Sequence, residues 1–138
     1  MVSGASEPAG MLADALGAFA RRIGLAFQLL DDVLDVTGPP SRTGKARGTD
    51  LLDGTVTLPL IAAAERDPAL REIDLRSLDA AGAEEGCDRI AATGALEEAR
   101  ERALALVAEA KEMLPAILPN GRAALLDLVA DAVVERYR

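Results

Sequence analysis

Four oxygen-bearing side chains share one face of a predicted helix in the first quarter of the chain: Gln28, Asp31, Asp32 and Asp35. Spacings of three and four residues bring them onto one narrow stripe, because an α-helix completes a turn every 3.6 residues. Carboxylates placed this way repel one another, and the helix dipole disfavours negative charge near a C-terminus. Mg²⁺, which takes carboxylate oxygens together with substrate phosphates, would offset that cost. The stripe therefore predicts metal ligation by Asp31, Asp32 and Asp35.

A solvated acidic face is the alternative interpretation, since most charge runs on helices simply face water. Two features favour the metal site. The rest of this helix is apolar or small, and a glycine-rich loop with the three cations Arg42, Lys45 and Arg47 follows it. A calcium-binding loop is disfavoured, because such loops alternate acids around a turn glycine whereas residues 31–35 are helical.

The loop after the helix offers a possible phosphate contact at Lys45. It is not a P-loop: five residues separate Gly38 from Gly44, and Ala46 stands where serine or threonine is required. A P-loop also follows a strand, and this segment follows a helix. Lys45 still supplies a point charge, and the glycines at 44 and 48 let backbone N–H groups approach an anion.

The elements that must position these residues are predicted to be helices throughout. Alanine, leucine, arginine and glutamate dominate, and the β-branched and aromatic runs typical of strands are missing, so we predict an all-α protein. The expected helices cover 9–36, 57–65, 85–93, 96–113 and 122–136, with one or two short helices within 67–86. The inner face of the fourth is expected to carry Leu96, Ala99, Ala103, Leu106 and Ala110, and that of the last Leu125, Leu128, Val129, Ala132 and Val133.

Composition excludes several classes of function. The chain has 138 residues, enough for about one domain, a formal net charge of −8 and no histidine. A nucleic-acid partner is disfavoured because it requires a basic face, and histidine bases or histidine-bound zinc are excluded. Cys87, the single cysteine, is expected to be a buried or inert thiol. No membrane span or signal peptide is expected, which favours a cytoplasmic protein.

These residues carry a family resemblance. The string from Gly24 to Asp35 is similar to the second aspartate-rich motif of the trans-polyprenyl (isoprenyl) diphosphate synthases, the polyprenyl synthetase family. The strings 44–51 and 57–61 resemble the block that follows that motif, and weaker similarity continues at 93–96 and 133–136. The resemblance implies the C-terminal half of an isoprenoid-synthase-type helical bundle. Residues 1–138 would form a partial synthase domain, with the motif at 27–35, a phosphate-contacting loop at 38–55 and C-terminal helices over 57–137.

The resemblance also implies an activity in isoprenoid biosynthesis. Members of this family are magnesium-dependent prenyltransferases that condense isopentenyl diphosphate with an allylic diphosphate. Carried over by position, Asp31 and Asp32 would bind magnesium directly. Asp35 would either bind it beside them or contact the groups that bind it. Gln28 would hydrogen-bond in the allylic pocket, and Lys45 would contact the allylic diphosphate. Asp31, Asp32 and Lys45 are thus the expected catalytic residues.

The sequence departs from the family in two respects. It lacks the family's first aspartate-rich motif, and Thr55 stands where many members carry lysine. We therefore expect this chain to be inactive alone. It would be a shortened form of a longer enzyme, which we favour, or one partner of a split synthase, or a non-catalytic binding or regulatory subunit. A plain helical interaction protein with solvated aspartates also stays open. A half-bundle would further expose an apolar face that self-association or a partner chain would cover.

Overall fold

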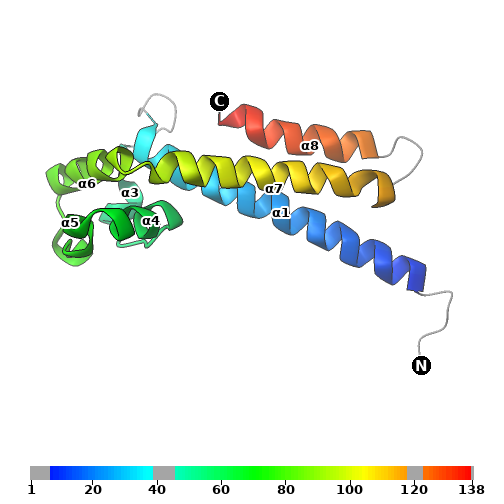
Figure 1. Ribbon diagram of the computed structural model, residues 1–138, viewed down its shortest axis with the longest axis horizontal. Coiled ribbons are helices and arrows are strands. Elements are labelled where there is room, and N and C mark those ends of the chain that lie inside the picture. The colour runs from blue at the N-terminus through cyan, green and yellow to red at the C-terminus, as the bar shows by residue number, and fades with distance from the viewer. Residues whose placement is uncertain (1–6, 39–45, 118–122, 138) are drawn as a thin grey trace. The chain divides into compact units, whose positions relative to one another are not determined.

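The computed structural model describes residues 7–38, 46–117 and 123–137, and all regular structure in these ranges is helical (Figure 1). The predicted all-α class is confirmed. The helices are α1 (Glu7–Thr37), α3 (Thr49–Leu52), α4 (Leu58–Arg66), α5 (Pro68–Arg71), the 3₁₀ helix η1 (Leu75–Ser77), α6 (Ala80–Ala92), α7 (Ala95–Ile117) and α8 (Ala123–Arg136). Within the described ranges, none of them is long and apolar enough to cross a membrane.

Local signals account for where the helices begin and end. α1 ends at Thr37, one residue beyond the expected end, and the Gly38 N–H donates to the carbonyl of Leu34 at 2.6 Å. α4 begins at Leu58 because the Thr57 hydroxyl accepts a hydrogen bond from the Leu60 N–H. α6 begins at Ala80, five residues before the predicted start at 85. The Asp79 carboxylate caps it by accepting from the Gly82 N–H at 2.8 Å.

The chain divides into two compact units, and α1 and α7 each contribute to both. The first unit comprises residues 1–27 and 103–138, and the second comprises 28–102. Buried apolar side chains of α1 and α7 form most of the core of the first unit, namely Phe19, Ile23, Ala26, Ala103, Leu106, Val107, Ala110 and Leu114. The five inner positions predicted for α7 are all buried, which confirms that part of the pattern.

The prediction of which face of α8 packs inward is wrong. Leu125 and Leu128 are 69% and 65% exposed, Val129 and Ala132 are also exposed, and Val133 is half-buried. Ala130 is buried instead. The reason is that α8 carries two apolar stripes, since Leu126, Ala130, Val133 and Val134 are also spaced by three and four. The second stripe lies on the packed side: Lys111 of α7 contacts Asp131 at 2.7 Å and Asp127 at 3.6 Å, which places that side of α8 toward α7. Figure 1 shows α8 beside α7.

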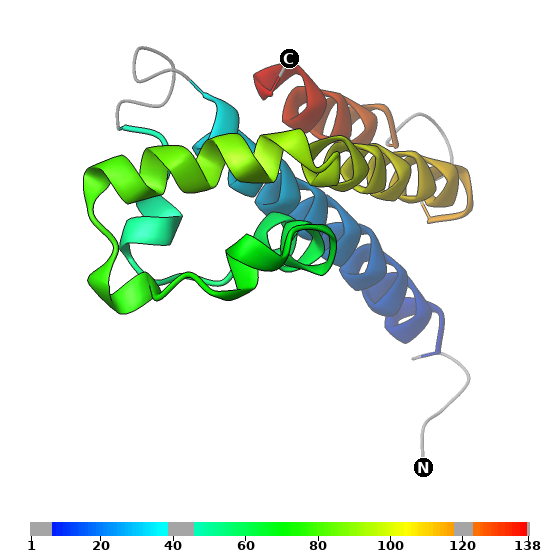
Figure 2. The ribbon, with the colours of Figure 1, turned by 60° about the vertical axis from the view of Figure 1, so that its left-hand side comes forward.

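The second unit has its own apolar core, to which every helix from the end of α1 to the start of α7 contributes. Its buried members are Val33, Val36, Leu51, Leu60, Ala63, Leu70, Ala83, Cys87, Ile90, Ala95, Leu96 and Ala99. The short helices α3, α4 and α5 all pack against α6 (Figure 2). Cys87 is a buried free cysteine, as expected, and burial raises the pKa of its thiol to about 11. A neutral thiol without access is a packing residue and not a nucleophile.

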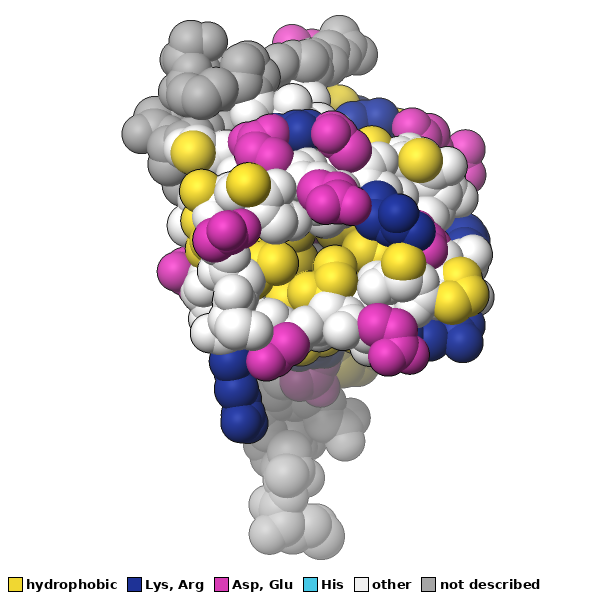
Figure 3. Space-filling view, turned by 90° about the vertical axis from the view of Figure 1, so that its left-hand side faces the viewer, with side chains coloured by type: hydrophobic (Ala, Val, Ile, Leu, Met, Phe, Trp, Pro, Cys, Tyr) yellow, Lys and Arg dark blue, Asp and Glu magenta, His cyan; other side chains and the backbone are white. Residues whose placement is uncertain are grey.

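Some apolar side chains of this unit lie at the surface. Figure 3 shows apolar side chains in the middle of the face formed by α3 to α6, with acidic and basic side chains around them. Leu52, Val56, Leu58 and Ile61 are between 41% and 62% exposed. The second unit therefore exposes apolar side chains, while the expected self-association or partner chain stays a prediction.

Candidate metal and diphosphate site

The last turns of α1 hold the predicted acidic stripe, and two of its members are in direct contact. The side-chain amide of Gln28 donates to Asp32 Oδ1 at 2.9 Å, as their separation by one helical turn allows. Gln28 is exposed, whereas Asp32 is only 9% exposed. Asp31, the neighbour of Asp32, is half-buried. The stripe is therefore partly enclosed by protein and is not a fully solvated acidic face.

Asp32 carries an electrostatic cost that a cation would relieve. Burial raises the pKa of its carboxyl above the ordinary value, the hydrogen bond from Gln28 lowers it, and the negative charges of Asp31 and Asp35 raise it again. The ionised carboxylate is thus disfavoured by its surroundings in this chain. A divalent ion beside Asp31 and Asp32 would compensate both the lost hydration and the repulsion, and their hard oxygen atoms are the donors that Mg²⁺ prefers.

Asp35, unlike Asp32, accepts hydrogen bonds from the backbone of residues 48 and 50. Asp35 as a whole is 5% exposed, and its Oδ2 accepts a hydrogen bond from the backbone N–H of Asp50 at 3.1 Å. Its backbone carbonyl accepts from the N–H of Gly48 at 2.9 Å. Gly48 has φ +81°, a left-handed conformation that glycine adopts without a side-chain penalty. Asp35 thus contacts the chain where it returns from the loop to begin α3, at residue 49.

The three aspartates do not form one ready-made ligand group. Across the described ranges, no cluster of three or more histidine, cysteine, aspartate or glutamate side chains is placed to hold a metal ion. The roles predicted for these residues stay predictions.

Of the three cationic residues of the loop, the structure describes only one. Arg42 and Lys45 lie outside the residues that the structure describes. Arg47 is described, and it binds α6: its Nε donates to Glu84 Oε2 at 2.7 Å and its terminal nitrogen donates to Asp88 Oδ1, also at 2.7 Å. Arg47 therefore fixes the end of the loop to α6 and is not oriented by these contacts toward the acidic stripe. Its partners lie 37 and 41 residues away in sequence, so no local pattern could have predicted them.

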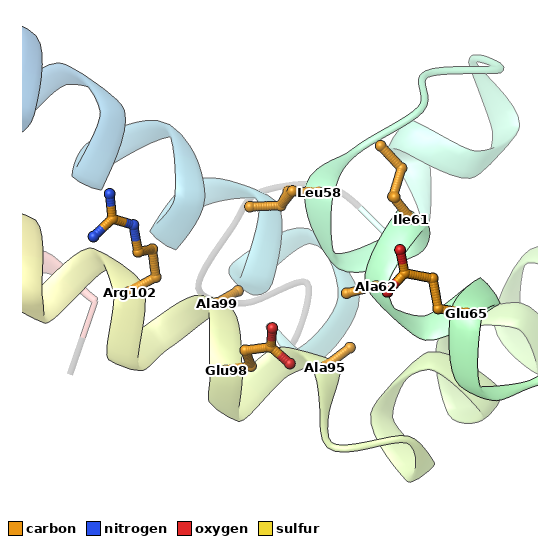
Figure 4. Close-up of a pocket in the computed structure, with 8 residues that line it drawn as sticks. All are labelled: Leu58, Ile61, Ala62, Glu65, Ala95, Glu98, Ala99 and Arg102. Carbon is orange, nitrogen blue, oxygen red and sulfur yellow. The ribbon is translucent and has the colours of Figure 1, made fainter.

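The second unit also has a pocket between α4 and α7. Figure 4 shows its lining, which consists of Leu58, Ile61, Ala62 and Glu65 from α4 and Ala95, Glu98, Ala99 and Arg102 from α7. None of the predicted site residues lines it. Its two carboxylates outnumber its single cation, and Glu98 is already paired with Arg66. Positive charge does not predominate in this lining, so its composition does not mark it as a diphosphate site.

Sequence reasoning missed the partners of Asp35, which are the backbone N–H groups of residues 48 and 50. One signal could have pointed to them. A helix that begins at Thr49 is preceded by Gly48, which has no side chain to cap the first N–H groups. In the structure, the Asp50 N–H in the first turn of α3 takes its acceptor from α1, at Asp35 Oδ2.

Comparisons with known proteins identify relatives of this chain. Residues 1–92 match the family model Polyprenyl synthetase. The chain is 37% identical over 113 residues to solanesyl diphosphate synthase 1, chloroplastic, of Arabidopsis thaliana, covering 80% of this chain and 28% of that protein.

Two solved structures have the same fold over most of the chain. Heptaprenyl diphosphate synthase from Staphylococcus aureus superposes with a TM-score of 0.80 at 25% identity. Polyprenyl synthase from Caulobacter crescentus, complexed with calcium and isoprenyl diphosphate, superposes with a TM-score of 0.78 at 33% identity. Each match covers 91% of this chain and 40% of the other. The chain thus spans less than half the length of the proteins that it resembles.

Proposed function

Because the chain belongs to the polyprenyl synthetase family, we propose that it is part of a prenyltransferase that joins isopentenyl diphosphate to an allylic diphosphate. Its share of the reaction is to bind Mg²⁺ and the allylic diphosphate at the end of α1. The observation that carries this proposal is Asp32, a carboxylate that is buried beside Asp31 and destabilised by burial and neighbouring charge. We also propose that the protein is located in the cytoplasm.

Within this proposal, each residue has a distinct task. Asp31 and Asp32 hold the ion, and Gln28 fixes the orientation of the Asp32 carboxylate through its hydrogen bond. Mg²⁺, when bound, supplies positive charge that stabilises diphosphate as a leaving group. Lys45, four residues before the described Thr49, adds a second positive charge on the diphosphate. The calcium and isoprenyl diphosphate named for the Caulobacter crescentus structure support a divalent ion and a diphosphate in this family.

Binding of Mg²⁺ together with inorganic diphosphate is expected to raise the melting temperature of the chain by several degrees. Ligand that binds only the native state at 100 times its Kd stabilises that state by about 2.7 kcal/mol. Asp31→Asn and Asp32→Asn are expected to remove the rise, because each deletes a charged ligand at nearly constant volume. The measurement is a thermal melt with Mg²⁺ alone, diphosphate alone and both together.

Asp53→Asn is the matched control for these variants. Asp53 is an exposed aspartate of the same unit, just after α3, and the proposal gives it no part in binding. This variant should keep the full rise. If the parent protein shows no rise with Mg²⁺ and diphosphate together, the binding proposal is contradicted and the chain is better described as a helical interaction protein.

A non-catalytic subunit, or one half of a split synthase, is the second candidate. The exposed apolar side chains of the second unit and of α8 favour it, because such surface is commonly covered by another chain. Both candidates predict that the chain alone releases no product from the two substrates. Restoration of product formation by a second chain would support the split synthase.

A further inference from the structure

The pocket between α4 and α7 opens on exposed apolar side chains of the second unit. Leu58 and Ile61 line it from α4, and these large apolar residues are 48% and 47% exposed. Ala95 and Ala99, which are buried, line it from α7 one helical turn apart (Figure 4). Their small side chains leave the hollow between the two helices open. Exposed apolar side chains around a hollow are typical of a surface that another molecule covers.

The size of the pocket indicates that a side chain of another protein enters it, and not a cofactor. Its volume is about 180 Å³, whereas pockets for drug-sized ligands commonly measure roughly 300–1,000 Å³. An extended peptide commonly binds by pairing with the edge of a strand. All regular structure in residues 7–38, 46–117 and 123–137 is helical. A helix that inserts side chains spaced by three and four residues into a groove therefore fits best.

Charge at the rim indicates the kind of helix. Glu65 of α4 and Glu98 of α7 line the pocket from its two walls, and Figure 4 shows Arg102 at the opposite end of the lining from Glu65. Arg66 pairs with Glu98, whereas Glu65 has no ion-pair partner among the described residues. A second copy of the chain would add another formal net charge of −8. Lysine or arginine on a partner complements this rim, and a second acidic copy does not.

We propose that the pocket between α4 and α7 is the docking site for an amphipathic helix of another chain, whose apolar face covers Leu58 and Ile61 and whose lysine or arginine pairs with Glu65. Such a basic side chain suits this place, because its methylene stem packs on apolar surface while its charge stays in water. No residue of the acidic stripe on α1 lines the pocket. The docking site is therefore independent of the proposed binding of Mg²⁺ and diphosphate.

Two synthetic helical peptides test this docking site on the whole chain. Both carry leucines spaced by three and four residues on one face. One peptide has lysines beside the leucines, and the other has glutamates at the same positions. The lysine peptide should bind at least about tenfold more tightly, and added salt should narrow the difference because it screens the charges. Fluorescence polarisation of the labelled peptides measures both affinities.

Variants of the chain locate the contact. Glu65→Lys should weaken binding of the lysine peptide at least about fivefold, because repulsion replaces the ion pair. Ile61→Asn should weaken binding of that peptide by a similar factor, since it places a polar group in the apolar contact. Both residues are exposed, so the fold should persist. Glu97→Lys is the matched control, because Glu97 is exposed on α7 and does not line the pocket; it should change the affinity by less than about twofold.

Three results would overturn the proposal: no binding of the lysine peptide, equal binding of the two peptides, or binding that Glu65→Lys leaves unchanged. Sedimentation of the chain alone tests whether a second copy occupies the pocket instead. A dimer that Ile61→Asn converts to a monomer would show that it does, and would also overturn the proposal. A monomer, or a dimer that Ile61→Asn leaves intact, agrees with a pocket that a basic helix of another chain fills.

Discussion

Replacing Ile90 with alanine is expected to lower the free energy of unfolding by about 2–5 kcal/mol, one of the largest effects for any single side chain of this protein. Ile90 lies on α6, is 1% exposed and belongs to the core of the second unit. The loss combines the transfer free energy of the deleted methyl and methylene groups with the cost of the cavity that they leave. Urea unfolding followed by helical circular dichroism measures it.

Ile61→Ala is the matched control, because it deletes the same atoms from a side chain that is 47% exposed on α4 of the same unit. Its expected cost is below about 1 kcal/mol, since little new surface is exposed and no enclosed cavity forms. Ile90→Val, which removes one methylene, should fall between the two at about 0.5–1.5 kcal/mol. Equal losses in Ile90→Ala and Ile61→Ala would contradict the position assigned to α6 in the core.

Gly48→Ala is expected to destabilise the protein by about 2–4 kcal/mol, for two separate reasons. The left-handed backbone at φ +81° is unfavourable for a residue with a Cβ atom. That Cβ would also lie 3.1 Å from the sulfur of Cys87 and 3.3 Å from the Cβ of Ala83, both on α6. The chain would have to move away from α6, which would also strain the hydrogen bond between the Gly48 N–H and Asp35.

Gly54→Ala isolates the backbone contribution to this loss. Gly54 has a similar φ of +73°, but an added Cβ would meet nothing within 4 Å. Its expected cost is therefore about 1–2 kcal/mol, from the left-handed conformation alone. Urea unfolding of the two variants gives the comparison. A loss in Gly48→Ala no larger than in Gly54→Ala would show that the close approach to α6 is absent in solution.

Much of the fold could be predicted because its causes are local. Helix-forming composition predicts the all-α class, and Gly38 followed by two prolines predicts the end of α1. Thr57 predicts the start of α4 through its capping hydroxyl. The spacing of Gln28 and Asp32 predicts their contact, because neighbours one turn apart on a helix meet whatever the tertiary structure.

Other features depend on contacts between distant residues, and the sequence does not reveal them. α8 has two apolar stripes of equal spacing, so periodicity alone could not predict which of them packs. The ion pairs of Asp127 and Asp131 with Lys111 link α8 to another helix and are not visible in the local pattern. Helical spacing likewise does not distinguish the three aspartates of the acidic stripe from one another. Only the tertiary structure directs Asp35 toward a backbone N–H that is 15 residues away, and leaves Asp31 and Asp32 as the neighbouring pair.

A crystal structure of the chain with Mn²⁺ and inorganic diphosphate tests the central claim most directly. Mn²⁺ takes the same oxygen ligands as Mg²⁺, and its anomalous scattering locates the ion independently of the protein density. The account predicts an anomalous peak at coordination distance from the carboxylates of Asp31 and Asp32, shared with the diphosphate. Crystals that contain diphosphate with no peak at this pair, or with Mn²⁺ bound only at another acidic group such as Glu84 and Asp88, would contradict it.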